Sequence, residues 1–564
     1  MSQHTFEIGL VGAGAISAGA YTGGVIDFMV QALDEWYDAK AKNQKVPPHD
    51  VKLSVFSGAS AGAITAALAT GYLGSDQPSI TTEGDAISRK GENKLFESWV
   101  EGIDISSLLD KRDLGREGSL VHSLLDSSVL TEIADRGLDV KPRSNPRPYV
   151  AKSFELLLTV TNLRGVPYAF KLLGANSSNY DMSLHADYVH FRLSDSDEDN
   201  LTDRYLMKWK EFDSTLSSPT KDKLKLSALA SGAFPIGLAP RNLAHLIKKN
   251  EDCYSSREWL IPTPHSHPHQ CVTPKTINVG WGAINPEGYE YNFQCVDGGV
   301  MNNEPFELAR RILAGPSSSN ERSGELAKKA VLLIDPFPSN PMFDPEYVAA
   351  PDLLKTALAL FSALKNQARF KPEELMLAAD ESVYSRFMIA PSRDGEKFGI
   401  ACGALGGFGG FLKRDFRSHD YFLGRRNAQK FFLDRFVLLE GNSLFDDWSE
   451  DLRSLHCVKD SEGAPQKESG QRFLPIIPLV GRAQAPCYKP SWPRYTPEDL
   501  DRLMEQVEER TSVVIDRLVH QYFKSNYWFT RWFAKFILGR KQNDVVEFAQ
   551  KMVKSELTKM KLMR

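Results

Sequence analysis

A serine surrounded by small residues is the first candidate for chemistry in this sequence. Ser60 lies in Gly58-Ala59-Ser60-Ala61-Gly62, a G-x-S-x-G pentapeptide between a β-branched run and an alanine-rich stretch. In hydrolases such a serine occupies a sharp turn between a strand and a helix, where the two elements pass close together and only small neighbours fit. The dipole of the following helix also favours an alkoxide at this position. The pentapeptide alone is equally compatible with a serine that caps a buried helix.

A glycine-rich segment, Gly12–Val25, lies between the first expected strand and the first expected helix. Its spacing also suits a dinucleotide-binding turn, but that turn needs an acidic residue at the end of the second strand, where this chain has Ser57-Gly58-Ala59-Ser60. The segment is better suited to an oxyanion hole, whose main-chain N–H groups stabilise the charge that develops on an ester carbonyl oxygen.

The candidate base is Asp297, in Val296-Asp297-Gly298-Gly299 at the end of an expected strand. An isolated aspartate before two glycines is more often a turn or cap residue. Together with Ser60 and the glycine-rich segment, it indicates a group that accepts the serine proton.

The elements that position these residues follow from hydrophobic periodicity. Strands are expected at residues 6–12, 51–57, 154–161, 187–193, 291–296 and 330–335, helices at 19–40 (with one apolar face) and 224–231, and surface loops at 74–94, 194–203 and 249–277. A strand, a helix and a strand in that order form a right-handed parallel crossover. The first 340 or so residues are therefore predicted to form an α/β domain with a mainly parallel sheet.

The pattern changes after this point. Residues 351–370 have long helical periodicity, Gly403–Phe416 is rich in glycine, and Pro478–Pro497 is rich in proline. We predict three units: a catalytic domain at 1–340, a mostly helical extension packed on it at 341–485, and a proline-rich linker with a basic helical tail at 486–564.

The three motifs, in this order, resemble the patatin-like phospholipase family. In that family a glycine-rich oxyanion loop follows the first strand, the nucleophile lies in G-x-S-x-G after the second, and an aspartate in D-G-G or D-G-A completes a Ser-Asp dyad without a catalytic histidine. The resemblance continues through Thr161-Asn162-Leu163, Ala230–Pro235 and the asparagines after Asp297, so it covers about residues 6–340. It implies a three-layer α/β fold with a mainly parallel central sheet, followed by a largely helical C-terminal region.

The resemblance also implies roles for individual residues. Ser60 attacks the acyl carbonyl, and Asp297 accepts its proton and later activates water. The motif glycines are Gly12, Gly19, Gly58, Gly62, Gly298 and Gly299. An aspartate with a pKa of about 3.9 is a weak base for a hydroxyl, so we expect the two side chains within hydrogen-bond reach. The implied activity is that of a lipid acyl hydrolase, a phospholipase A or lysophospholipase-like esterase, that acts on a lipid ester without cofactor or metal.

One departure concerns the oxyanion loop. The family's loop reads G-G-G-x-R-G, whereas this chain has Gly14–Gly19, with Ala18 in the arginine position. Main-chain donors survive a change of side chain, so Gly14, Ala15 and Ile16 remain the candidate oxyanion donors. The missing arginine weakens the case for phospholipid preference more than the case for hydrolase chemistry. It leaves open a second hypothesis, a catalytically weak member that binds lipid or a protein partner.

Two groups of histidines offer alternatives to this interpretation. A Ser-Asp-His triad would need His419, which lies in a charged stretch more typical of a structural network between helices. In the alternative α/β-hydrolase fold, several strands also precede the nucleophile, and here only two do. His265, His267 and His269 alternate along the chain and could bind zinc or copper, but neighbouring prolines favour a loop.

Composition limits the remaining classes. A formal net charge of −4 over 564 residues does not call for nucleic acid as a partner, and no run reaches the apolar length of a membrane span. The first apolar segment is typical of a strand rather than a secretory signal, and six scattered cysteines are expected as free thiols, so we predict a cytoplasmic protein. No feature indicates the oligomeric state.

The C-terminal tail has an unusual charge and aromatic content. Gln521–Arg564 contains ten Lys or Arg and three acidic residues, with an aromatic and basic run at Tyr527–Leu538. Such a run fits either a helix docked on the catalytic domain or a peripheral contact with the inner face of the membrane.

Overall fold

The computed structural model describes most of the chain. The described residues are 4–116, 119–144, 147–171, 179–196, 203–247, 252–257, 260–261, 275–276, 289–315, 320–337, 363, 380, 382–393, 395–522 and 546–563. Several features of the sequence analysis lie outside the described residues: Cys271, the three alternating histidines, the aromatic run Tyr527–Leu538 and all but one residue of the helical stretch 351–370.

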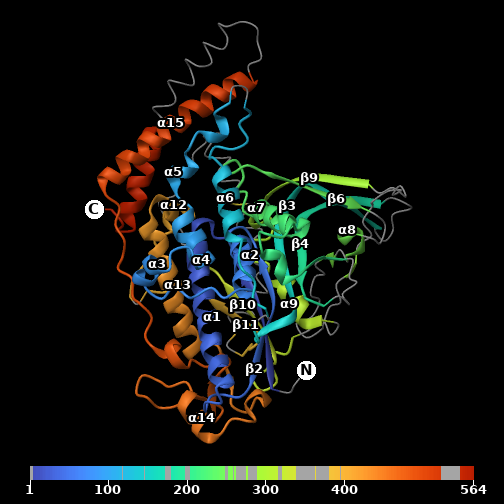
Figure 1. Ribbon diagram of the computed structural model, residues 1–564, viewed down its shortest axis with the longest axis vertical. Coiled ribbons are helices and arrows are strands. Elements are labelled where there is room, and N and C mark those ends of the chain that lie inside the picture. The colour runs from blue at the N-terminus through green and yellow to red at the C-terminus, as the bar shows by residue number, and fades with distance from the viewer. Residues whose placement is uncertain are drawn as a thin grey trace.

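A mainly parallel sheet crosses the centre of the molecule (Figure 1). Among the described residues its main strand order is β11 (Arg386–Ile389), β10 (Lys329–Ile334), β1 (Thr5–Gly12), β2 (Asp50–Gly58), β3 (Val150–Lys171), β4 (Asn179–Leu193) and β5 (Tyr205–Met207). Strands run parallel from β11 to β3, whereas β3 and β4 are antiparallel. A further strand, β9 (Tyr289–Asp297), pairs antiparallel with β3 and with β6 (Arg241–Ile247). The predicted α/β class with a mainly parallel sheet is confirmed.

The register of this sheet brings the candidate residues to one edge. Gly12 at the end of β1 pairs with Gly58 at the end of β2, so the turns after the two strands lie side by side. Gly58 in turn pairs with Leu158 of β3, and Asp297 of β9 pairs with Val160, two residues further along β3. The carboxyl ends of parallel strands are the usual location of a ligand site in an open α/β sheet.

Helices cover both faces of the sheet. On one face, α1 (Gly19–Ala41), α2 (Ala61–Leu73) and α7 (Pro219–Ser231) share the main apolar core with the strands. On the other, α9 (Phe306–Ala314) packs on alternate strand residues such as Val11 and Val55. Because successive strand side chains point to opposite faces, the two clusters use different residues of the same strands. The predicted three-layer arrangement is confirmed.

The helix α1 differs from the sequence-based expectation of a single apolar face. Its residues are buried on every side from Gly19 to Val30. The covering element is α13 (Arg414–Asp434), which lies along α1 in Figure 1. The two helices approach so closely that a Cβ on Gly24 would overlap the carbonyl of Tyr421, and a Cβ on Gly424 would overlap that of Tyr21. Glycine at both positions therefore permits backbone contact.

The chain after residue 340 contributes to the same sheet and core. β11 extends the parallel sheet beyond β10, and α13 packs on α1. A buried ion pair between Asp27 of α1 and Arg425 of α13 joins the two helices. The unit boundaries at 340 and 485 stay predictions. A boundary at 340 would separate β11 from β10, with which it pairs in the same sheet.

Two further elements differ from the sequence analysis. The predicted loop at 74–94 contains the short helix α3 (Glu83–Ser88), whose first turn is capped by the Thr82 hydroxyl. β3 and β4 are longer than predicted because they continue together as an antiparallel pair beyond the parallel part of the sheet.

The remaining elements surround this framework. They are α4 (Lys94–Phe96), α5 (Ile105–Leu108), α6 (Ser128–Gly137), α8 (Cys253–Ser256), α12 (Gly409–Leu412), α14 (Glu450–His456), α15 (Pro497–Tyr522), β7 (Leu260–Ile261), β8 (Lys275–Thr276), β12 (Val437–Leu439), β13 (Lys467–Glu468) and β14 (Gln471–Pro475). Within the described ranges, no helix has both the length and the apolar character that crossing a membrane requires.

Candidate active site

Ser60 occupies the turn between β2 and α2, in a backbone conformation that few residues adopt. Its φ of 52° and ψ of −125° lie outside the regions favoured by a residue with a side chain. Strained backbone of this kind persists only where surrounding contacts hold it, and it clusters at functional sites. A Cβ on Gly58 would come within 2.5 Å of the Gly62 carbonyl oxygen, and one on Gly62 would overlap the Gly12 carbonyl. The small residues of the pentapeptide are therefore required by the close approach of the two turns.

The structure brings Ser60 and Asp297 together. Ser60 Oγ donates a hydrogen bond of 2.6 Å to Asp297 Oδ2. The other carboxylate oxygen, Oδ1, accepts from the N–H of Gly299 at 2.7 Å. Both side chains are buried, with 6% of Ser60 and 5% of Asp297 exposed. The carboxylate is thus held on one oxygen by the backbone and presents the other to the serine hydroxyl.

A short segment that begins with the last residue of α7, Ser231, holds both residues through hydrogen bonds. The Ser231 hydroxyl accepts a hydrogen bond of 2.9 Å from the N–H of Ser60. Two residues later, the Ala233 carbonyl accepts the N–H of Asp297 at 2.9 Å. In the sequence this segment contributes only to the family resemblance, and no role was predicted for it. The serine in this motif, Ser231, is the signal in the sequence that could have indicated a role beside Ser60.

The glycine-rich loop after β1 lies directly beside Ser60. A Cβ on Gly14 would overlap the Asn303 side-chain oxygen and would come within 3.1 Å of the Ser60 Cβ, so glycine is needed at this position. The N–H of Gly14, however, donates to the Asn303 carbonyl at 3.0 Å. Gly14 is therefore corrected from an oxyanion donor to a residue that lets the loop approach the serine. Asn303, which follows the aspartate motif, was not singled out for this role in the sequence analysis.

Two of the proposed donors remain. No described residue accepts a hydrogen bond from the N–H of Ala15 or of Ile16. Ile16 opens a 3₁₀ turn, Ile16–Ala18, with a φ of 50°, a second strained position in this site. Of the other motif glycines, Gly19 packs against the Trp99 ring, and a Cβ on Gly298 would overlap the Thr159 carbonyl.

His419 lies in a structural network rather than beside the dyad. Its Nδ1 is 2.7 Å from Asp420 Oδ1, and its ring meets Trp492 edge-on at 5.0 Å between centroids. The Asp420 carboxylate also accepts the N–H groups of Ala401 and Cys402 at 2.9 and 2.8 Å. This arrangement matches the structural alternative given for His419 in the sequence analysis.

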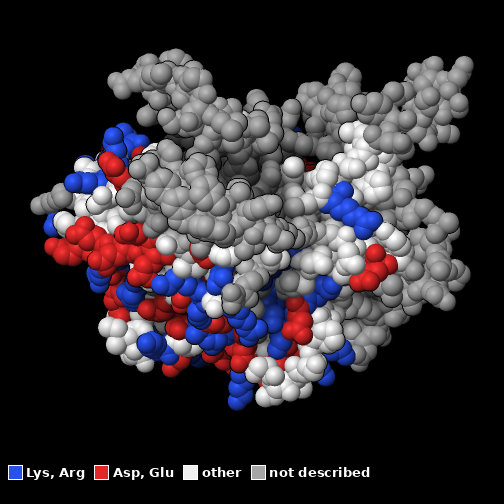
Figure 2. Space-filling model, turned by 90° about the horizontal axis from the view of Figure 1, so that it is seen from above, with Lys and Arg blue, Asp and Glu red and all other residues white. Residues whose placement is uncertain are grey.

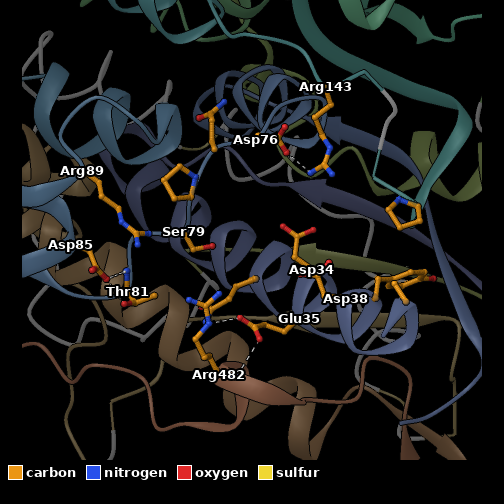
Figure 3. A pocket seen from close by; sticks show the side chains of 16 residues that line it. Asp34, Glu35, Asp38, Asp76, Ser79, Thr81, Asp85, Arg89, Arg143 and Arg482 are labelled. Atoms are coloured by element: carbon orange, nitrogen blue, oxygen red, sulfur yellow. Dashed lines mark hydrogen bonds and ion pairs between the residues drawn. The ribbon is translucent and has the colours of Figure 1, made fainter. Parts of the chain in front are cut away.

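A separate pocket of about 600 Å³ lies beside the second half of α1 (Figure 3). Neither Ser60 nor Asp297 lines it. Its charged side chains face one another in pairs, such as Arg143 with Asp76 at 2.7 Å and Arg482 with Glu35 at 2.5 Å. Ion pairs bridge this pocket, and most of the side chains that line it are polar or charged.

Charge is mixed on the surface seen from above. Figure 2 shows Lys and Arg side chains interspersed with Asp and Glu side chains over the described part of this face. Within the described residues, no group of three or more His, Cys, Asp or Glu side chains is arranged to hold a metal ion. The absence of a nucleic acid or metal partner stays a prediction.

Comparisons with known proteins agree with the motif assignment. A family model described as "Patatin-like phospholipase" matches residues 10–310, which run from β1 to α9. A protein of Sinorhizobium fredii (strain NBRC 101917 / NGR234), named "Uncharacterized protein y4iI", is 37% identical over 555 residues, covering 92% of this chain and 77% of that protein. The crystal structure of VipD from Legionella pneumophila matches over 99% of this chain and 86% of the VipD chain, with 11% identity. The TM-score of this match is 0.24, which is too low to support a structural argument. The family match contains Ser60, Asp297 and the glycine-rich loop.

Proposed function

Because the chain belongs to the patatin-like phospholipase family, whose members hydrolyse lipids, we propose that it is a lipid acyl hydrolase with a Ser60–Asp297 dyad. One observation carries the proposal. The hydroxyl and the carboxylate form a 2.6 Å hydrogen bond although they lie 237 residues apart in the chain. A buried serine hydroxyl aimed at a buried carboxylate, in a strained turn at a helix N-terminus, is the arrangement that nucleophilic catalysis requires.

The geometry supports a two-step reaction. Ser60 Oγ attacks the ester carbonyl carbon as its proton passes to Asp297 Oδ2. The oxyanion of the tetrahedral intermediate accepts hydrogen bonds from the N–H groups of Ala15 and Ile16. When the intermediate collapses, the carbon–oxygen bond to the alcohol breaks and Asp297 returns the proton to the leaving oxygen. Water, deprotonated by Asp297, then attacks the acyl carbon. The bond to Ser60 Oγ breaks, Asp297 returns the proton to Oγ, and the carboxylic acid is released.

The proposed reaction is tested by labelling and product release together. Wild type should react with a fluorophosphonate probe and release fatty acid from a panel of phospholipids, lysophospholipids and simple esters. Ser60→Ala and Asp297→Asn should lose fatty acid release, and Ser60→Ala should lose labelling. The matched control is Ser57→Ala, since the Ser57 hydroxyl is equally buried in β2 but donates to the Pro305 carbonyl. Activity that survives Ser60→Ala would contradict the dyad.

The second candidate function is that of a catalytically weak lipid-binding or protein-interaction module. The observation that favours it is Ala18 in the position of the family's loop arginine. Wild type that is silent in both assays but binds lipid vesicles would favour this function over the hydrolase.

We also propose that the protein meets its substrate as a peripheral protein on the cytoplasmic side of a membrane. The aromatic and basic run of the tail supports this proposal. Removing everything after Pro497 would also remove Leu557, which is fully buried, so substitutions give a cleaner experiment. Replacing Trp528, Trp532 and Phe533 by alanine should lower the fraction of protein that floats with lipid vesicles. An unchanged fraction would show that the aromatic and basic run does not anchor the protein.

A further inference from the structure

We propose that the glycine-rich segment Gly403–Leu412 positions the oxyanion-hole amides of Ala15 and Ile16, acting through the side chain of Ser17. The segment comes from the half of the chain that the family match does not cover. It supplies rigidity to a loop that has no arginine of its own. This inference rests on the proposed function, because it concerns how the same site stabilises the oxyanion.

The loop needs an external support because its backbone is strained. Ile16 is β-branched and has a φ of 50°, a conformation that such residues rarely adopt. Its side chain packs in a small apolar cluster with Phe408 and Phe411. Since strained backbone persists only where surrounding contacts determine it, the contacts around Ile16 set the direction of the neighbouring N–H groups.

Ser17 ties the loop to the glycine-rich segment by two hydrogen bonds. Its hydroxyl is fully buried and donates to the Gly407 carbonyl at 2.5 Å. The same oxygen accepts the N–H of Gly410 at 3.0 Å. The Ser17 hydroxyl therefore both donates to and accepts from the same segment. Its two partners, Gly407 and Gly410, are 390 and 393 residues away in the chain.

The glycines explain why this segment can make both bonds. Leu405, Gly406 and Gly407 have φ values of 55°, 64° and 106°, a left-handed turn that depends on glycine. At Gly410, a Cβ would come within 2.5 Å of both the Ser17 Oγ and the Cys402 Sγ. Any side chain at this position would separate the segment from Ser17.

The segment is itself fixed on its far side by α13. The Asp420 carboxylate accepts the N–H groups of Ala401 and Cys402, just before the segment. Arg417, which is 1% exposed, donates through Nη1 to the Gly410 carbonyl at 2.7 Å. Because α13 packs on α1, and α1 begins at Gly19, one rigid pair of helices holds both the loop and its support.

Ser17 is a positioning residue, since it acts through the backbone of Ala15 and Ile16 and not on the substrate. An oxyanion donor acts on the charge of the transition state, so a misdirected N–H slows turnover without weakening ground-state binding. Misplacement by about 1 Å can reduce turnover about 100-fold. We therefore expect Ser17→Ala to lower kcat by about 10- to 100-fold, with KM changed by less than about twofold.

The experiment compares Ser17→Ala with Ser75→Ala in the full-length chain. Ser75 is a matched control because its hydroxyl is also buried and bonded to backbone carbonyls, Gly71 at 2.8 Å, but at the far end of α2. Active sites are first titrated with the fluorophosphonate probe, and kcat and KM are then measured per titrated site on a soluble ester. A residue that only supports folding would lower the titrated fraction and leave kcat per site unchanged.

Ser17→Cys keeps the side-chain shape with weaker hydrogen bonding, and we expect its kcat between those of wild type and Ser17→Ala. If Ser17→Ala fails to fold, the kcat per site of Ser17→Cys decides the question. A wild-type kcat per site in the folded variant would overturn this inference alone. A wild type that neither labels nor turns over would overturn the proposed function, and this inference with it.

Discussion

The turn of the proposed nucleophile, Ser60, and the proposed oxyanion loop, Gly14–Gly19, lie side by side, yet they are held by different parts of the chain. Ser60 is fixed by Gly12, Gly62, Ser231 and Asp297, all within the residues that match the family model. Ser17, in the oxyanion loop, is held by Gly407 and Gly410, which lie outside that match.

Both regions contain a strained residue that is not glycine, Ser60 and Ile16. The two strained residues are therefore held in place by different parts of the chain. The family motifs determine the serine geometry by close packing of small residues. The loop, where this chain departs from the family motif, depends on a segment that belongs to the second half of the molecule. Substitutions in each region can separate these two dependences.

The largest effect is expected within the nucleophile turn. Ser60→Ala, Asp297→Asn and the double variant should each lose about 10⁴-fold or more in kcat, with losses that do not add, because the two side chains act as one unit. Fatty acid release per mole of folded protein measures these losses, with folding checked by thermal unfolding. Additive losses would mean that the two residues act independently.

Ser231→Ala tests whether the support of Ser60 is as important as that of the loop. The variant leaves the buried Ser60 N–H without its acceptor, which typically costs about 1–3 kcal/mol of stability. We expect kcat to fall about 10- to 100-fold, comparable to the effect of Ser17→Ala. Urea unfolding and kcat per titrated site are the measurements. Loss of stability with normal kcat would show that the elbow keeps its geometry without this bond.

Adjacent glycines of α1 test the contact between the two halves of the chain. Gly24→Ala should destabilise the protein by about 1–3 kcal/mol, because the new Cβ overlaps the Tyr421 backbone. Gly23→Ala is the matched control, since a Cβ there meets the Tyr421 ring at an ordinary 3.5 Å. That variant should be neutral or gain up to about 1 kcal/mol from its better helix propensity. Thermal unfolding distinguishes the two, and equal effects would contradict the close helix crossing.

A last effect, confined to acidic pH, is expected at His49, which precedes β2 and contacts the C-terminal part of the chain. His49 Nε2 lies 2.9 Å from the Ile476 carbonyl, and Trp448 Nε1 donates to His49 Nδ1 at 3.2 Å. Burial lowers the pKa of His49 from its ordinary value to about 3. Below an unfolded pKa of about 6.5 only the unfolded chain takes up the proton, so stability is lost as the pH falls from there toward 3.

Between pH 7 and pH 5 this single group should account for about 2 kcal/mol of the unfolding free energy. His49→Gln should flatten the pH slope of urea unfolding by that amount, whatever it does to stability at pH 7. An unchanged slope in His49→Gln would contradict the buried neutral imidazole.

Much of the framework could be predicted from the sequence because its causes are local. The first strand, the long helix and the second strand are each within two residues of their predicted bounds, since hydrophobic periodicity is a property of short segments. The candidate serine and aspartate were identified because small-residue motifs reflect turns that only such residues can form.

The predictions failed where distant segments meet. The helix α1 has an apolar sequence pattern that fits one buried face, but α13 covers the other side through glycines at 24 and 424. Gly14 has the position of an oxyanion donor, but the Asn303 carbonyl occupies its N–H. Neither partner can be inferred from spacing, because hydrogen bonds and packing across hundreds of residues depend on the path of the whole chain.

The sequence by itself therefore determined the chemical groups of this protein and the short turns that present them. Hydrophobic periodicity and small-residue motifs extend over a few residues, so they can be recognised in the sequence without knowledge of the fold. The tertiary structure alone decided that Ser60 meets Asp297 at 2.6 Å and that Ser17 meets Gly407 and Gly410. It also decided that the N–H of Gly14 has an acceptor, whereas no described residue accepts a hydrogen bond from the N–H of Ala15 or Ile16. Hydrogen bonds form only within about 3.5 Å, so these contacts exist only once folding has brought β1, β2, β9 and the Gly403–Leu412 segment together.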